Sequence, residues 1–208
     1  MADGRLRIAS IVEGHGEQSA IPRLLTRICK ELLNAEFVDV LKPNRKRRDR
    51  LIGNIGAELE KAVEAAARLL AERGKDGIPS LILVIVDADD DCAAAIAAQI
   101  RRVTTATRRD VRSACVVAVK EYETWFVAAA ESLHDHLVCD QNEIPLDPES
   151  QRCGKAWIEK RFRSPKYSET TDQPRLTSQM DLVVCRERCP SFDKLCRELE
   201  KALSGVEP

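Results

Sequence analysis

Four apolar segments along the chain have the pattern of buried β-strands. They cover residues 5–12, 36–41, 80–86 and 113–119. The third segment, from Ser80 to Val86, is apolar on both of its faces, as expected of a central parallel strand that lies between two layers of helices. Because these segments alternate with helical patterns, we predict an α/β fold with an open, mainly parallel sheet flanked by helices.

Between the predicted strands, apolar residues recur at steps of three and four, which is the period of an amphipathic helix. This pattern predicts helices within residues 21–32, 59–70, 96–103 and 122–133. A final helix is expected to begin at Pro190, because proline is tolerated in a first helical turn. The basic segment from Lys42 to Arg50 is expected to be a loop.

The segment from Val138 to Thr177 is polar, contains four prolines and keeps no apolar period for long. We expect an extended subdomain or lid here, with one helix around residues 155–161. The predicted organisation is a single domain over residues 1–208. It consists of an α/β core (1–137) and a polar C-terminal extension with the closing helix (138–208).

The apolar pattern and the N-terminal sequence indicate where in the cell the protein is expected. The longest apolar run, residues 81–86, is far shorter than the roughly 20 residues that span a bilayer. The N-terminus lacks the basic, apolar and small-residue order of a secretory signal. We therefore expect a cytoplasmic protein with no membrane partner.

The chain contains eight cysteines but no CxxC motif. Reduced and mostly buried thiols are the expected state in the cytoplasm. A zinc site built from Cys185, Cys189 and Cys196 is the functional alternative, although no fourth ligand follows at a zinc-finger spacing.

Acidic residues stand at the ends of three predicted strands. Glu13 follows the first, Asp87 and Asp89 follow the third, and Glu121 and Glu123 follow the fourth. The carboxyl ends of parallel strands form the edge of a sheet where ligands bind. Carboxylates gathered there repel one another unless a cation lies between them, and hard oxygen ligands suit Mg²⁺ or Mn²⁺. The sequence therefore predicts a divalent-metal site.

Other acidic and polar residues near these strand ends have simpler interpretations. Asp90 and Asp91 are expected to cap the helix that follows them. His15 is either a solvated loop side chain or a metal ligand or base, and Mg²⁺ prefers oxygen ligands. Its loop, Gly14-His15-Gly16, matches neither a dinucleotide-binding nor a Walker fingerprint.

Several of these motifs resemble known families. The segments Ile11 to Gly14 and Val86 to Asp89, each after a predicted strand, are similar to the motifs of the Toprim domain. Further similarity lies in four pieces that occur in the order expected for domain of unknown function 4276, a bacterial Toprim-like family: Glu123 to Phe126, Gly154 to Trp157, Tyr167, and Pro190 to Phe192. This resemblance covers nearly the whole chain and implies a Toprim-like fold.

The resemblance also implies roles for individual residues. Glu13 resembles the Toprim glutamate, a metal ligand or proton-transfer group, and Asp87 and Asp89 resemble the metal-binding pair. Glu123 is expected to add a carboxylate for a second metal. Lys155 is a candidate for neutralising charge on a phosphate, with a solvated helix lysine as the alternative.

Two further residues near Glu13 differ in how they relate to the family motif. Glu17 lies one helical turn after Glu13 and is an additional candidate. His15 stands where the family loop usually carries a smaller or Thr-like residue, so no role is carried over to it.

The net charge of the chain is only −1, which excludes binding of nucleic acid by bulk charge. Basic residues are nevertheless concentrated in two segments, 42–50 and 101–112, which together carry a charge of +9. Such segments can contact phosphates without reading sequence, although solvated surface is the alternative for each. The candidate nucleic-acid contacts are Arg45, Lys46, Arg47, Arg48, Arg108 and Arg109.

These observations favour a Mg²⁺- or Mn²⁺-dependent phosphodiesterase, a nuclease that acts on DNA or RNA. The resemblance further implies an ABC-type ATPase as a partner in a bacterial defence or repair module. The alternative is a non-catalytic subunit that uses the same scaffold to bind such an ATPase.

Overall fold

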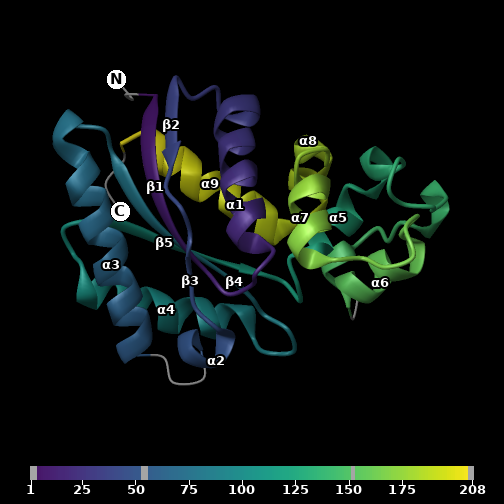
Figure 1. The fold of residues 1–208 in the computed structure, drawn as a ribbon, viewed down its shortest axis with the longest axis horizontal. Coiled ribbons are helices and arrows are strands. Elements are labelled where there is room, and N and C mark those ends of the chain that lie inside the picture. The colour runs from purple at the N-terminus through teal and green to yellow at the C-terminus, as the bar shows by residue number, and fades with distance from the viewer. Residues whose placement is uncertain (1–3, 53–55, 151–152, 206–208) are drawn as a thin grey trace.

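A parallel β-sheet forms the centre of the protein (Figure 1). The computed structural model describes residues 4–52, 56–150 and 153–205. The strands run in the order β2-β1-β4-β5, and the short β3 pairs with the end of β1. Their bounds are β1 (Arg5–Val12), β2 (Phe37–Val40), β3 (Asn44–Arg45), β4 (Ser80–Asp87) and β5 (Arg112–Ala118). The predicted α/β fold with a mainly parallel sheet is confirmed.

Each face of the sheet carries its own apolar cluster. In the central strand β4, Leu81, Leu83 and Ile85 belong to one cluster, whereas Ile82 and Val84 belong to the other. This alternation follows from the two-residue period of a strand. All of these side chains are buried, so β4 is the central strand that its apolar pattern predicts.

The two faces are covered by different helices. Helices α3 (Ala57–Arg73) and α4 (Ala93–Thr107) cover one face. Helices α1 (Glu17–Arg27) and α9 (Pro190–Leu203) cover the other, and α1 continues into a π-helical turn at Ile28–Leu32. Figure 1 shows α5 (Glu123–Ala128), α6 (Gly154–Arg161), α7 (Glu169–Thr177) and α8 (Leu182–Arg188) grouped beside the sheet.

The C-terminal helix is part of the main core. Phe192 of α9 packs edge-on against Trp125 of α5, with ring centroids 5.3 Å apart. The indole N–H of Trp125 donates a hydrogen bond to the hydroxyl of Ser191. One apolar cluster therefore runs from β1 to α9 across residue 137, the boundary expected between core and extension.

Some elements differ from the sequence-based prediction. Residues 42–50 were expected to form a loop, but they contain β3 and the start of α2 (Arg48–Leu51). The predicted helix near residues 155–161 is confirmed as α6, whereas α7 and α8 were not predicted. Helix α7 contains Pro174, which ordinarily argues against a helix interior, and β3 is too short to show a pattern.

The ends of two predicted helices also shift. The Arg-rich segment 101–112 begins inside α4, which continues to Thr107. The helix expected over residues 122–133 consists of α5 followed by a 3₁₀ turn at Ala130–Leu133. Within the described parts of the chain, we find no helix with the length and apolar character needed to cross a membrane.

Candidate metal centre

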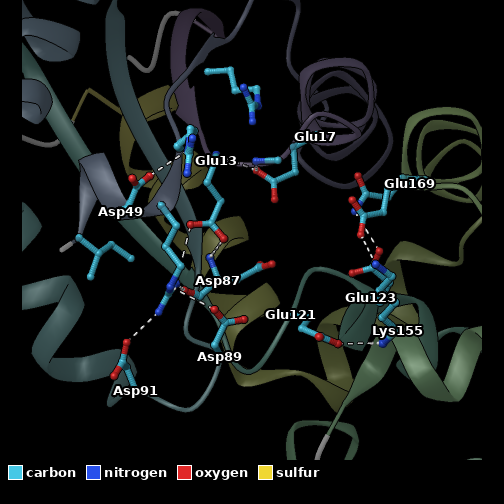
Figure 2. Close-up of a pocket in the computed structure, with 16 residues that line it drawn as sticks. Glu13, Glu17, Asp49, Asp87, Asp89, Asp91, Glu121, Glu123, Lys155 and Glu169 are labelled. Carbon is cyan, nitrogen blue, oxygen red and sulfur yellow. Dashed lines mark hydrogen bonds and ion pairs between the residues drawn. The ribbon is translucent and has the colours of Figure 1, made fainter.

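The carboxyl ends of β1, β4 and β5 open into one pocket of about 730 Å³ (Figure 2). Glu13 and Asp87 lie on one side of it, and Glu123, Lys155 and Glu169 lie on the other. The predicted gathering of acidic residues at this edge of the sheet is therefore present. The acids that line the pocket are Glu13, Glu17, Asp49, Asp87, Asp89, Asp91, Glu121, Glu123 and Glu169.

Three of these carboxylates are close enough to share one cation. Oxygen atoms of Glu13, Glu17 and Asp87 lie within 4.8 Å of one another. Glu13 and Asp87 are two of the predicted metal ligands, and Glu17 was an additional candidate. The sequence signal for Glu17 was its position one helical turn after Glu13.

The turn between β1 and α1 fixes the position of Glu17. The carboxylate of Glu17 accepts hydrogen bonds from the backbone N–H groups of Glu13, at 3.1 Å, and Gly14, at 3.2 Å. The backbone N–H of Asp87 is 3.4 Å from Oε1 of Glu13 and donates to it. The first turn of α1 therefore folds its acid back over the end of β1, beside the end of β4.

Gly16 allows this turn to pack against α7. A Cβ atom at Gly16 would overlap Oε1 of Gln173 and the backbone carbonyl of Glu169. Glycine is thus required by the close approach of two backbones.

Burial makes the three carboxylates difficult to ionise together. It raises the pKa of Glu13 to about 7 and, with the nearby charge of Glu13, that of Glu17 to about 8. Burial and the charges of Glu17 and Glu13 also raise the pKa of Asp87 well above its usual range. A bound cation would remove this penalty because it compensates the negative charge inside the pocket.

The donor set fits a hard divalent cation. All three ligand groups are carboxylates, which suit Mg²⁺ or Mn²⁺. In addition, Oε2 of Glu13 is buried and accepts no hydrogen bond within the described residues. The guanidinium of Arg48 is 3.7 Å from this oxygen, which is within ion-pair distance but too long for a hydrogen bond.

Asp89 lies outside this group of three, although it was predicted as a metal ligand together with Asp87. Its carboxylate pairs with Nε of Arg48 at 3.0 Å, and its side chain is half exposed. Arg48 also pairs with Asp91 at 2.8 Å and donates hydrogen bonds to the backbone carbonyls of Asp87 and Ala88. Arg48 therefore holds the β4–α4 loop against the segment that contains β3 and α2.

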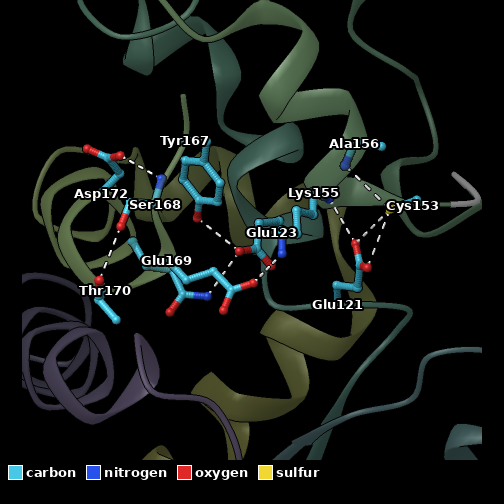
Figure 3. Close-up of polar contacts among 11 residues, drawn as sticks. Glu121, Glu123, Cys153, Lys155, Ala156, Tyr167, Ser168, Glu169, Thr170 and Asp172 are labelled. Atoms are coloured by element: carbon cyan, nitrogen blue, oxygen red, sulfur yellow. Dashed lines mark hydrogen bonds and ion pairs between the residues drawn. The ribbon is translucent and has the colours of Figure 1, made fainter. Parts of the chain in front are cut away.

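Glu123 lies on the opposite wall within a buried hydrogen-bond network (Figure 3). Its Oε1 accepts hydrogen bonds from the Tyr167 hydroxyl, at 2.9 Å, and from Nε2 of Gln173, at 3.1 Å. Burial raises the pKa of Glu123, while the hydrogen bond from Tyr167 lowers it. The predicted ligand thus lines the pocket but is not one of the three close carboxylates. Sequence reasoning missed Gln173 because it lies in a helix that was not predicted.

The other two candidate residues on this wall, Lys155 and Glu121, have partners within the protein. Nζ of Lys155 lies 2.5 Å from Oε1 of Glu169, and this interaction raises the pKa of Lys155. Glu121 accepts a hydrogen bond from the backbone N–H of Lys155 at 2.8 Å and one from the Cys153 thiol. Glu121 therefore accepts one of the free backbone N–H groups in the first turn of α6, whose N-cap residue is Cys153.

The structure separates the two basic segments. Arg45, Arg47 and Arg48 line the pocket beside the acids. Lys46 pairs with Glu58 at 3.8 Å.

The second segment lies at the other end of the sheet. Arg108 directly follows α4, in the connection that leads to β5 at Arg112, and pairs with Glu64 and Asp110. Arg109 is exposed next to it. Because β5 ends at the pocket and starts here, Arg108 and Arg109 do not share a site with the acids.

The remaining candidates do not form a metal site. In the described part of the chain, the acids Glu13, Glu17 and Asp87 form the group with metal-ligand spacing, and it includes no cysteine. Cys185, Cys189 and Cys196 are buried free thiols. His15 is exposed and does not line the pocket.

Comparisons with known proteins place the chain in a family. Neither the curated proteins nor the solved structures contain a significant match. A family model described as "Domain of unknown function (DUF4276)" matches residues 12–200, a range that includes every residue lining the pocket. The chain therefore belongs to the DUF4276 family.

Proposed function

We propose that this protein is a divalent-metal-dependent phosphodiesterase that cleaves DNA or RNA. The observation that carries the proposal is the group formed by Glu13, Glu17 and Asp87, whose carboxylate oxygens lie within 4.8 Å of one another beside three arginines. Carboxylates beside arginines suit a site that binds a metal cation and a phosphate anion next to each other.

Each group of side chains has a part in this proposal. Glu13, Glu17 and Asp87 would hold Mg²⁺ or Mn²⁺. When bound, the cation supplies Lewis acidity that stabilises negative charge on a phosphoryl oxygen. The β3–α2 side would supply positive charge for a phosphate, and Glu123 on the opposite wall offers a carboxylate that Tyr167 and Gln173 keep in place.

The Toprim-like motifs around Glu13 and Asp87 support this assignment. The family resemblance extends the proposal to a partner, an ABC-type ATPase in a bacterial defence or repair module, and the setting that we propose is the cytoplasm. The competing function, a non-catalytic subunit that binds such an ATPase, predicts no cleavage and is separated by the same experiment.

The test is a cleavage assay with labelled single- and double-stranded DNA and RNA. The protein would be incubated with Mg²⁺ or Mn²⁺, alone and with a candidate ATPase. We expect cleavage that chelation abolishes, and that Glu13→Gln and Asp87→Asn each reduce by about 100-fold or more, a loss of about 3 kcal/mol of transition-state stabilisation.

Asp90→Asn is the matched control. Asp90 lies in the same loop as Asp89, but its carboxylate is almost fully exposed, pairs with Lys120 and does not line the metal pocket. This variant should cleave at the wild-type rate. Absence of cleavage in every combination, or equal cleavage by folded Asp87→Asn protein, would refute the enzyme assignment.

A further inference from the structure

Arg45 occupies a special position beside the three carboxylates. It lies in β3, which pairs in parallel with the end of β1, so that Arg45 is in register with Val12. The next residue, Lys46, donates its backbone N–H to the carbonyl of Val12 at 2.9 Å. Because Val12 directly precedes Glu13, this pairing places Arg45 beside the end of β1. The side chain of Arg45 lines the same pocket as Glu13.

The other cations that line the pocket have carboxylate partners. Arg47 pairs with Asp49, Arg48 pairs with Asp89 and Asp91, and Lys155 pairs with Glu169. Among the described residues, the remaining cationic side chain that lines the pocket is Arg45.

Arg45 has no ion pair with any residue in the described ranges 4–52, 56–150 and 153–205. Its Nε is buried and has no hydrogen-bond partner there. Burying a donor of a charged group without a partner is costly, which favours an external anion at this position.

We propose that Arg45 forms an anion subsite that binds a phosphate group of the substrate next to the cation site. Arg48, in contrast, is a positioning residue that holds the β4–α4 loop. The assignment of this anion to a substrate phosphate rests on the proposed nuclease function, whereas the anion subsite itself rests on the geometry of Arg45.

The lining of the pocket indicates which part of a nucleic acid would bind there. An arginine guanidinium presents a planar set of donors that matches a phosphate in a bidentate contact. No aromatic side chain of the described residues lines the pocket, so bases have no stacking surface. The subsite is therefore specific for the phosphodiester backbone and independent of base sequence.

Binding would be measured by fluorescence polarisation with a labelled single-stranded DNA 12-mer and an RNA of the same sequence. Ca²⁺ would replace Mg²⁺ so that binding is followed without turnover. The variants are Arg45→Gln, Arg45→Lys and, as a matched control, Arg109→Gln, which removes an exposed arginine near the opposite end of the sheet. Mn²⁺ affinity of each variant would be measured by calorimetry.

We expect Arg45→Gln to weaken binding of both probes by about tenfold or more and to lower the salt-dependence slope by about 1. Arg45→Lys should retain part of the affinity because it keeps the charge but loses the planar fork. Arg109→Gln should change affinity by less than about twofold, since charges beyond a Debye length are screened. Mn²⁺ affinity of Arg45→Gln should stay near the wild-type value.

Other results would overturn the subsite. The subsite is refuted if wild-type protein binds neither probe, or if Arg45→Gln protein binds both probes as tightly as wild-type protein does. It is also refuted if Arg109→Gln lowers the affinity as much as Arg45→Gln does. If Arg45→Gln loses binding while wild-type protein cleaves nothing with Mg²⁺ or Mn²⁺, the anion subsite stands and the nuclease function fails. If wild-type protein cleaves and Arg45→Gln leaves KM unchanged, the nuclease stands and the subsite fails.

Discussion

At the scale of single residues, Arg48 shows how the acidic pocket is held together in the absence of a cation. Its guanidinium lies between Asp89 and Asp91 and reaches within 3.7 Å of Glu13. The same group donates to two backbone carbonyls at the end of β4. A positive charge inside an acidic pocket lowers the repulsion among the carboxylates, so Arg48 stabilises the cation-free protein.

This role predicts the effect of Arg48→Gln. The variant should lose about 2 kcal/mol of unfolding free energy without metal, because several acids lose their shared counter-charge in a partly buried site. Mn²⁺ should recover part of that loss. Chemical denaturation with and without Mn²⁺ measures both effects.

Arg47→Gln provides the control for this measurement. The side chain of Arg47 is 72% exposed and pairs only with Asp49 among the described residues, so its loss should cost less than about 0.5 kcal/mol. Equal stability of the Arg47→Gln and Arg48→Gln proteins would show that Arg48 has no such role.

At the scale of elements, the pocket depends on the close contact between α7 and the turn that precedes α1. Gln173 of α7 hydrogen-bonds Glu123, and its Oε1 lies against Gly16. The two walls of the pocket are thereby joined, because Gly16 precedes Glu17 while Gln173 supports Glu123.

A substitution at Gly16 tests this connection. Gly16→Ala should destabilise the protein by about 2 kcal/mol, because the new methyl group would overlap Gln173 and the backbone of Glu169. It should also weaken Mn²⁺ binding, since a shifted turn displaces Glu17. Thermal unfolding and calorimetry provide the two measurements.

Gly74→Ala is the matched control, because a Cβ at Gly74 would meet no atom of the described residues within 4 Å. It should change stability by less than about 1 kcal/mol. A Gly16→Ala protein that is as stable as Gly74→Ala and binds Mn²⁺ normally would contradict the proposed contact.

The elements differ in how well the sequence predicts them. Strand β4 and helix α9 are long and strongly patterned, and both were predicted because burial alone sets their periods. Helix α7 was missed because its short polar sequence around Pro174 is stabilised by contacts with distant segments. The predicted acids Glu13 and Asp87 do come together, whereas Asp89 pairs with Arg48 of α2, a helix of four residues that is too short to show a local pattern.

At the scale of the whole molecule, the acidic pocket should make stability depend on both pH and metal. Burial raises the pKa of Glu13 to about 7 and that of Glu17 to about 8, against an ordinary value of 4.5. When the pKa of an acid is higher in the folded than in the unfolded state, the free energy of unfolding falls as pH rises from the unfolded pKa to the folded pKa. For these residues the loss falls between about pH 4.5 and pH 8.

The most direct test of the proposed cation site is the unfolding free energy at pH 5.5 and pH 8.0, each with and without Mn²⁺. Without metal, the protein should be less stable at pH 8.0 by roughly 2 to 5 kcal/mol, from about 1.4 kcal/mol for each pKa unit. Mn²⁺ should restore most of this stability at pH 8.0 and little at pH 5.5, because the carboxylates must be ionised to bind it. Metal-free protein that is equally stable at both pH values, and that Mn²⁺ does not stabilise at pH 8.0, would contradict a cation site at Glu13, Glu17 and Asp87.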